Sequence, residues 1–474
     1  ALPFDRLRAT LLWRGERWEA RDLRATTPGG GGVRGTASLD TGAKVDLLGR
    51  AIPRVELDLA AEALDLARLS AALPATRIAG RARAGGARFD VDLADASREG
   101  VALAARGTLD GQTLRIESAR ARSLPGMPGA RLDVAGSAGL RAPFDADLAG
   151  EFERLDPSAL ALLARRWLPQ VAAARQRASE PAPSSPAGAA ADASGPLDAL
   201  ARVHASLDGR WRVRGPLRLA AGAALDASLE VERGTLAGLP IRAALDGRFQ
   251  AGRAERVTLD LALADARLRA SGAFGAPDDR LALRADVPAL ARIAPLLGAP
   301  GVAGALEVDA TLRGRADAPG VDARANVRAL ALPGDVTVRS AALSLTLPQL
   351  AGRWSDARVS AHVDARELRV RGTAFDALAF DADGSASAHA FRARLDGARL
   401  RASAAGSAAL APGPSWSATL RELGLEGTVG ARLARPATIE LSPAGARVGA
   451  LSIVSDHGEV NLARASWRDG RAEL

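Results

Sequence analysis

Residues 267–297 read RLRASGAFGAPDDRLALRADVPALARIAPLL. Leucines alternate with charged residues, a Gly-Ala-Pro-Asp-Asp segment interrupts the alternation, and a short amphipathic segment ending in Pro-Leu-Leu follows. A period of two between apolar and polar residues is typical of a strand that buries one face. The stretch therefore predicts a pair of strands followed by a short helix laid against them.

The same order of elements recurs along the chain. ALDLARLSAALP (63–74), RLDPSALALLARRWLPQ (154–170) and ADVPALARIAPLL (285–297) each have an Asp near the start, apolar residues at helical spacing and a proline near the end. These patterns predict short helices near 64–73, 157–168 and 288–297, with Asp65, Asp156 and Asp286 as N-caps and Pro157 in the first helical position. The strand–helix order is thus an internal repeat.

Asp-Gly dipeptides separate many of the alternating runs. A type I′ turn needs two residues that tolerate positive φ, so each Asp-Gly predicts a hairpin. Hairpins in succession make an antiparallel meander. The dipeptides are Asp110-Gly111, Asp208-Gly209, Asp246-Gly247, Asp396-Gly397 and Asp469-Gly470.

The composition favours thin layers over one thick core. The chain has 474 residues, no cysteine, no tyrosine and only 3% aromatic residues, so burial has to rest on Ala, Leu and Val. Together with the alternation, this predicts a mainly β fold: an elongated, curled antiparallel sheet that forms an apolar, taco-like groove, with a few short α-helices.

A Pro-, Ala- and Ser-rich stretch interrupts the pattern at 174–196. It has no apolar period and is typical of a linker. We therefore expect a first stretch of groove repeats at 1–170, a linker at 171–196 and a second stretch at 197–474. The chain ends one half-strand after an Asp-Gly dipeptide, which is typical of a segment of a longer protein.

Several function classes are disfavoured. The net charge of +8 is spread along the chain, with Arg alternating against Asp and Glu, whereas nucleic-acid binding needs clustered basic residues and stacking aromatics. The four histidines are far apart, and no motif for catalysis, metal or cofactor binding occurs in a fitting context. No signal peptide or apolar run long enough for a membrane-spanning helix is found. We therefore expect no catalytic residues, no metal and no cofactor.

Apolar stripes are the candidate binding residues. They alternate with Asp, Arg, Thr and Ser, and the chain has too few helices to cover them, so they predict a continuous apolar groove. Ordinary core packing is the alternative for any single leucine. The stripes are Val257, Leu259, Leu261, Leu263, Leu281, Leu283, Leu306, Val308, Leu343, Leu345 and Leu347.

The order of these segments resembles the TamB family of Gram-negative bacteria, with AsmA-like proteins as more distant relatives. The resemblance lies in LDLALADARLRASGAFGAPDDRLALRADVPALARIAPLL, GALEVDATLRGRADAPGVDARANVRAL and IELSPAGARVGALSIVSDHGEVNLARASWRDGRAEL. It covers most of 197–474 and, more loosely, 1–170.

The resemblance implies a non-enzymatic protein that crosses the periplasm, anchored in the inner membrane by a segment outside this sequence. It implies phospholipid movement between the two membranes, with acyl chains held in the apolar groove of the eleven stripe residues. It also implies cooperation with an outer-membrane assembly barrel similar to TamA, through regions also outside this sequence. A β-rich surface adhesin or autotransporter-like solenoid is the alternative, although parallel coils rarely use two-residue hairpins. A membrane β-barrel fits less well because its aromatic girdles are absent.

Overall fold

The computed structural model describes residues 5–27, 31–40, 54–65, 77–95, 101–123, 127–159, 204–218, 222–348, 357–385, 387–411, 415–427, 430–442, 445–468 and 471–473. The chain divides into two compact units, unit 1 (Ala1–Ala243) and unit 2 (Ala244–Leu474). The boundary lies within strand β13 (Leu239–Gln250). The sequence-based division at 171–196 falls outside the described residues and stays a prediction.

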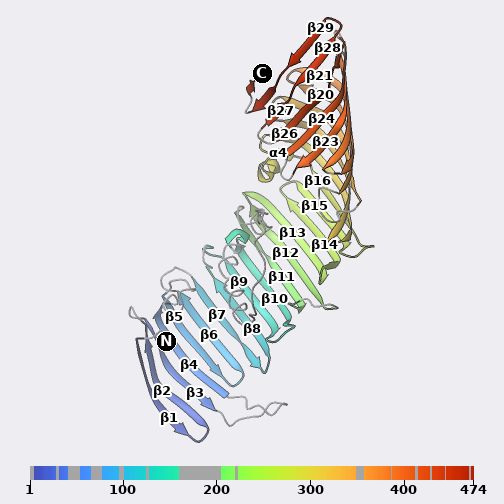
Figure 1. Ribbon diagram of the computed structural model, residues 1–474. Helices are drawn as coiled ribbons and strands as arrows, with labels where there is room; N and C mark the ends of the chain where they lie inside the picture. Colours follow the sequence, from blue (N-terminus) through green and yellow to red (C-terminus); the bar gives the residue numbers. More distant parts are fainter. Residues whose placement is uncertain are drawn as a thin grey trace, which may run out of the picture. The chain divides into compact units, whose positions relative to one another are not determined.

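Unit 1 is an antiparallel meander in which each strand pairs with its neighbours in the chain (Figure 1). β10 and β11 pair directly, although residues 160–203 lie between them in the sequence. The strands are β1 (Arg6–Arg14), β2 (Arg17–Thr26), β3 (Gly32–Asp40), β4 (Arg54–Leu64), β5 (Ile78–Gly85), β6 (Arg88–Asp95), β7 (Ala102–Asp110), β8 (Thr113–Arg122), β9 (Arg131–Gly139), β10 (Asp145–Leu155), β11 (Ala205–Pro216) and β12 (Ala224–Leu236).

Unit 2 repeats the same construction from β14 to β24 (Figure 1). The strands are β14 (Arg253–Leu263), β15 (Ala266–Phe274), β16 (Arg280–Val287), β17 (Ala303–Arg315), β18 (Ala318–Leu332), β19 (Val336–Leu347), β20 (Arg358–Val370), β21 (Thr373–Ser385), β22 (Ala388–Asp396), β23 (Leu400–Ala411) and β24 (Ser415–Gly427). The predicted fold class, a mainly β antiparallel sheet with few short helices, is confirmed.

The sheet of unit 2 forks after β24. Residues 416–420 of β24 pair with β26, whereas Gly424 and Leu425 pair with β25. One branch continues through β27 and β30 to β31, and the other through β28 to β29. The short strands are β25 (Ala431–Leu433), β26 (Ala437–Ser442), β27 (Gly445–Val448), β28 (Leu451–Ser455), β29 (Gly458–Leu462), β30 (Ala465–Arg468) and β31 (Arg471–Glu473).

The Gly-Ala-Pro-Asp-Asp segment forms the connection between β15 and β16. Asp279, whose side chain is buried, accepts two hydrogen bonds from the Arg253 guanidinium, at 2.9 and 2.8 Å, and one from the Ala276 amide at 2.8 Å. The hydrogen bonds from Arg253 lower the pKa of the Asp279 carboxyl. This carboxylate therefore ties the turn to the neighbouring strand.

One of the three predicted helices lies wholly within the described residues. It consists of α4 (Leu290–Ile293) and a 3-10 turn, η1 (Ala294–Leu297). The predicted N-cap Asp286 is wrong: it stays in β16, and Ala289 occupies the N-cap without a side-chain hydrogen bond.

The second predicted helix begins as expected. Asp156 accepts hydrogen bonds from the amide and the hydroxyl of Ser158, at 2.9 and 2.7 Å, and helix starts at Pro157. The continuation from 160, and the helix predicted at 64–73 beyond residue 65, lie outside the described residues.

The Asp-Gly predictions succeed in part. Asp110-Gly111 and Asp396-Gly397 lie where one strand ends and the next begins, with Gly111 at a φ of 57°. Asp208-Gly209 and Asp246-Gly247 instead lie inside β11 and β13. Asp469-Gly470 is outside the described residues.

Glycines inside strands face aromatic rings. Gly209 lies opposite Phe152 in the β10–β11 ladder, and a Cβ on Gly209 would come within 2.8 Å of that ring. The same Cβ would come within 2.0 Å of the Glu230 carbonyl oxygen. Glycine is therefore required inside the strand, by the close approach of both the ring and the backbone, and the dipeptide failed as a turn signal here.

The cores are thin. Among the described residues, no large side chain is fully buried. Buried apolar residues form three small clusters in unit 2, the largest of them centred on Phe391 and Leu420. A sheet in one layer buries little, and much of its apolar surface stays accessible.

Candidate functional site

The register of unit 2 aligns apolar residues into rows that cross the strands. Side chains directly opposite each other in an antiparallel pair point to the same face. Row A runs through six strands without a polar residue: Leu259, Ala270, Leu283, Ala310, Ala323 and Leu345.

Three further rows lie on the same face, since their residues are an even number of positions from row A along each strand. Row B is Leu261, Leu268, Ala285, Val308, Ala325 and Leu343; row C is Val257, Gly272, Leu281, Leu312, Val321 and Leu347; row D is Val287, Leu306, Val327 and Ala341. We call rows A–D the apolar face of unit 2.

The structure brings all eleven sequence-predicted residues onto this apolar face. Ten of them belong to rows A–D, and Leu263 pairs with Ala266 at the end of the β14–β15 hairpin, on the same side as Leu261. Their binding of acyl chains stays a prediction, but their common placement is the geometry that such binding needs.

Cover on the apolar face is partial. Helix α4 packs at its margin, where Leu290 contacts the cluster formed with Val287 and Leu306 of row D. Away from the helix, Leu343 and Leu345 are 37% and 40% exposed. Leu259, Leu283 and Leu306 are half-buried and Ala270 is buried, so the most accessible part of the apolar face lies on β19. Large apolar side chains that stay accessible on one sheet face are typical of a binding surface.

The opposite face is polar and carries ion pairs. Arg267 donates two hydrogen bonds to Asp260, at 2.9 and 2.5 Å, and these lower the pKa of the Asp260 carboxyl. Arg284 lies 3.8 Å from Asp309 on the next strand. These exposed pairs give the sheet one solvated face, as an antiparallel sheet in a single layer requires.

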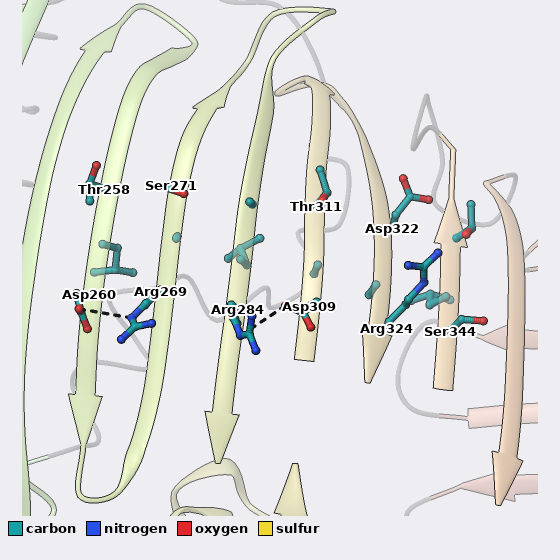
Figure 2. Close-up of a pocket in the computed structure, with 18 residues that line it drawn as sticks. Thr258, Asp260, Arg269, Ser271, Arg284, Asp309, Thr311, Asp322, Arg324 and Ser344 are labelled. Carbon is teal, nitrogen blue, oxygen red and sulfur yellow. Dashed lines mark ion pairs between the residues drawn. The ribbon is translucent and has the colours of Figure 1, made fainter. Parts of the chain in front are cut away.

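A hollow of about 860 Å³ extends across β14–β19. Two rows of the polar face line it: Asp260, Arg269, Arg284, Asp309, Arg324 and Ser344, and Thr258, Ser271, Ala282, Thr311, Asp322 and Thr346. Figure 2 shows their side chains along neighbouring strands. Row A, which lies between these two rows along each strand, also lines the hollow.

Row A continues beyond the predicted stripes. Its next members are Ala361, Ala382, Phe391, Gly406, Leu420 and Ala437.

An equivalent row crosses unit 1, and the sequence-based choice of residues missed it. It consists of Leu11, Ala20, Ala37, Leu57, Ala84, Phe89, Gly107, Ile116, Gly136, Leu148, Val213 and Ala227. The alternation of apolar and polar residues in segments such as VELDLA could have indicated this row. Many of its members are alanine or glycine, however, and these residues do not stand out as apolar in the sequence.

The histidines do not converge. On the polar face of unit 2, His362 lies between Asp381 and Asp364, with nitrogen–oxygen distances of 2.6 and 2.7 Å. Hydrogen bonds that the imidazole donates to these carboxylates, the one to Asp381 first, raise the pKa of His362. His389 is buried and hydrogen-bonded to Trp416. Within the described ranges, no group of three or more His, Cys, Asp or Glu residues is arranged to hold a metal ion.

Three comparisons bear on this site. The family model described as "TamB, N-terminal domain" matches residues 186–450, a span that contains all of rows A–D. No curated protein and no solved structure matches the chain. Among the described residues, no helix has the length and apolarity needed to cross a membrane.

Proposed function

The chain belongs to the TamB family, whose N-terminal domain matches more than half of its length, and from this premise we propose that it is a non-enzymatic bridge of the bacterial envelope that conducts phospholipid in support of outer-membrane biogenesis. The acyl chains lie on the apolar face, and the polar face remains in water.

The observation that carries the proposal is the uninterrupted apolar face of unit 2. Row A crosses six strands without a polar side chain, and its member Leu345 and the neighbouring Leu343 of row B remain accessible. An acyl chain laid across these rows would stay out of water from one strand to the next.

The free-energy cost of exposing an acyl chain to water makes an apolar surface necessary. Each methylene kept out of water is worth about 0.8 kcal/mol, so a chain of roughly sixteen carbons gains on the order of 12 kcal/mol from an apolar surface. A lipid that crosses water without cover would have to lose that amount. A series of neighbouring apolar sites lowers the cost of each step.

We further propose the location and partners that fit this role. The protein lies in the periplasm, held at the inner membrane by a segment outside this sequence. A TamA-like outer-membrane barrel is its protein partner, through regions also outside this sequence. The mixed charge of the polar face, where Arg267 and Arg269 both lie near Asp260, offers no basic patch for nucleic acid.

The solenoid alternative does not fit the ladders. The ladders that join β1 to β12 and β14 to β31 are antiparallel, whereas the coils of a β-solenoid stack in parallel. We therefore retain the lipid-conducting function.

The experiment compares two adjacent residues on opposite faces. A photo-crosslinking amino acid replaces either Leu345, on row A, or Ser344, on the polar face, in the full-length protein in cells. We expect phospholipid to be captured at Leu345 and not at Ser344. Equal capture at both positions, or none at Leu345, contradicts the proposal.

A further inference from the structure

The apolar face changes character between β19 and β24. Leu345 is 40% exposed on row A, whereas Phe391 and Leu420, further along the same row, are each 5% exposed. Row A is therefore accessible at Leu345 on β19 and covered by the protein's own side chains at Phe391 and Leu420.

Three aromatic rings provide that cover. The centroids of Phe380 and Phe391 are 6.3 Å apart in a stacked arrangement, and Trp416 meets Phe391 edge-on at 5.4 Å. Leu433 and Ile439, from the first strand of each branch of the fork, pack against the same cluster. Rings in these arrangements attract one another beyond their burial.

Small residues beneath the rings let them lie close to the sheet. Phe391 is directly opposite Ala382 on one side and Gly406 on the other, and a Cβ on Gly406 would come within 3.0 Å of the Phe391 ring. The Phe391 ring therefore fills the space above row A that, on the preceding strands, is open to a ligand.

A hydrogen bond fixes the position of the indole. Trp416 Nε1 donates to His389 Nε2 at 3.0 Å, and His389 Nδ1 lies 3.2 Å from the Ser385 carbonyl oxygen, to which it donates. His389 is itself buried. Because His389 accepts at one nitrogen and donates at the other, it is neutral and holds the ring in one orientation.

We propose that Phe380, Phe391 and Trp416 form an aromatic gate on the acyl-chain path. Lipid occupies the apolar face at β14–β19 and passes β21–β24 only when the rings move aside. The inference rests on the proposed function. It goes further by naming the residues that limit passage.

The test uses two photo-crosslinking positions with matched exposure. Leu345 lies before the gate and Leu441, on β26, beyond it, with exposures of 40% and 42%. Leu441 is directly opposite Trp416 and therefore on the apolar face. Glu440, its exposed neighbour on the other face, is the control for chance contact.

In the unaltered full-length protein we expect phospholipid capture several-fold lower at Leu441 than at Leu345. Phe391→Ala should raise capture at Leu441 several-fold and leave Leu345 unchanged. Phe391→Leu, which retains more of the packing volume, should give an intermediate result and serves if the alanine variant fails to accumulate.

The outcomes separate the gate from the proposed function. Capture at Leu441 equal to that at Leu345 in the unaltered protein overturns the gate and leaves transport standing. Failure of both Phe391 variants to raise capture at Leu441 also overturns it. Absence of capture at both leucines in all three proteins overturns the proposed function itself.

Discussion

At the scale of single residues, glycines provide room for aromatic rings on the next strand. Phe89 faces Gly107, Trp211 faces Gly150 and Phe152 faces Gly209, each directly across a ladder. In each pair, a Cβ on the glycine would approach the ring within 3.0 Å. The rings restore packing that glycine alone lacks.

The first prediction concerns Gly406, opposite Phe391. Alanine is better than glycine in an unconstrained strand, but here its Cβ would meet the Phe391 ring and the Thr419 carbonyl oxygen. Gly406→Ala should therefore lower the free energy of unfolding by about 1–3 kcal/mol, measured by urea denaturation. In Gly85→Ala the Cβ meets nothing within 4 Å, and the change should stay within about 0.5 kcal/mol. Equal effects would contradict the crowding argument.

The second prediction concerns pH and His362. Because Asp381 and Asp364 raise its pKa in the folded state above 6.5, its stabilisation is fully present below the unfolded pKa and is lost as pH rises through the folded pKa. The urea concentration at the unfolding midpoint should be lower at pH 8.5 than at pH 5.5. His362→Gln should make that difference smaller. His457→Gln, in the β28–β29 turn, is the matched control. A pH profile that His362→Gln leaves unchanged would rule out this role.

At the scale of elements, α4 depends on one buried anchor. Leu290 is 8% exposed and packs with Ala266 and Val287, whereas Leu297 at the end of η1 is 74% exposed. A helix of four residues has too few hydrogen bonds to persist by itself. The packing of Leu290 against the sheet therefore holds α4 over row D.

The third prediction follows from that anchor. Leu290→Ala should cost about 2–5 kcal/mol locally and speed hydrogen exchange of the amides at 291–297. Leu297→Ala, on the same segment, should change exchange little. If both variants exchange alike, the contact between Leu290 and the sheet does not hold the helix.

Sequence periodicity located the strands and the eleven stripe residues because each lies in a run without a bulge. It does not reveal how rows join across a bulge. Ala329, at a φ of 49°, lies between the pairs Ala305–Arg328 and Ala303–Ala331 of the β17–β18 ladder, where β18 has one residue more than β17, and the extra residue resets which positions face inward. The covered segment around Phe391 was missed for a related reason, since alanine and glycine give no alternation signal.

At the scale of the whole molecule, each unit presents one apolar row that crosses its strands and one solvated face. In unit 1 the row runs from Leu11 to Ala227, and in unit 2 from Leu259 to Ala437. The two-faced sheet is therefore the common plan of both units, and function is expected to depend on which face a substitution alters.

The fourth prediction tests that dependence with neighbouring residues. Leu283→Arg places a charge on row A, where an uncompensated charge raises the barrier to every acyl chain, whereas Ala282→Arg places it on the exposed polar face. Both proteins should accumulate. Only Leu283→Arg should make the outer membrane permeable to a normally excluded dye. Equal permeability in the two strains would leave row A as packing alone.

The fork after β24 also bears on self-association. A strand of 13 residues with a free edge is a template onto which another chain can add and start a fibre. Here that edge is divided between β25, with three residues, and β26, with six. Neither of these strands offers a foreign chain a continuous edge as long as β24, so the fork makes this edge of the sheet a poorer template for a fibre.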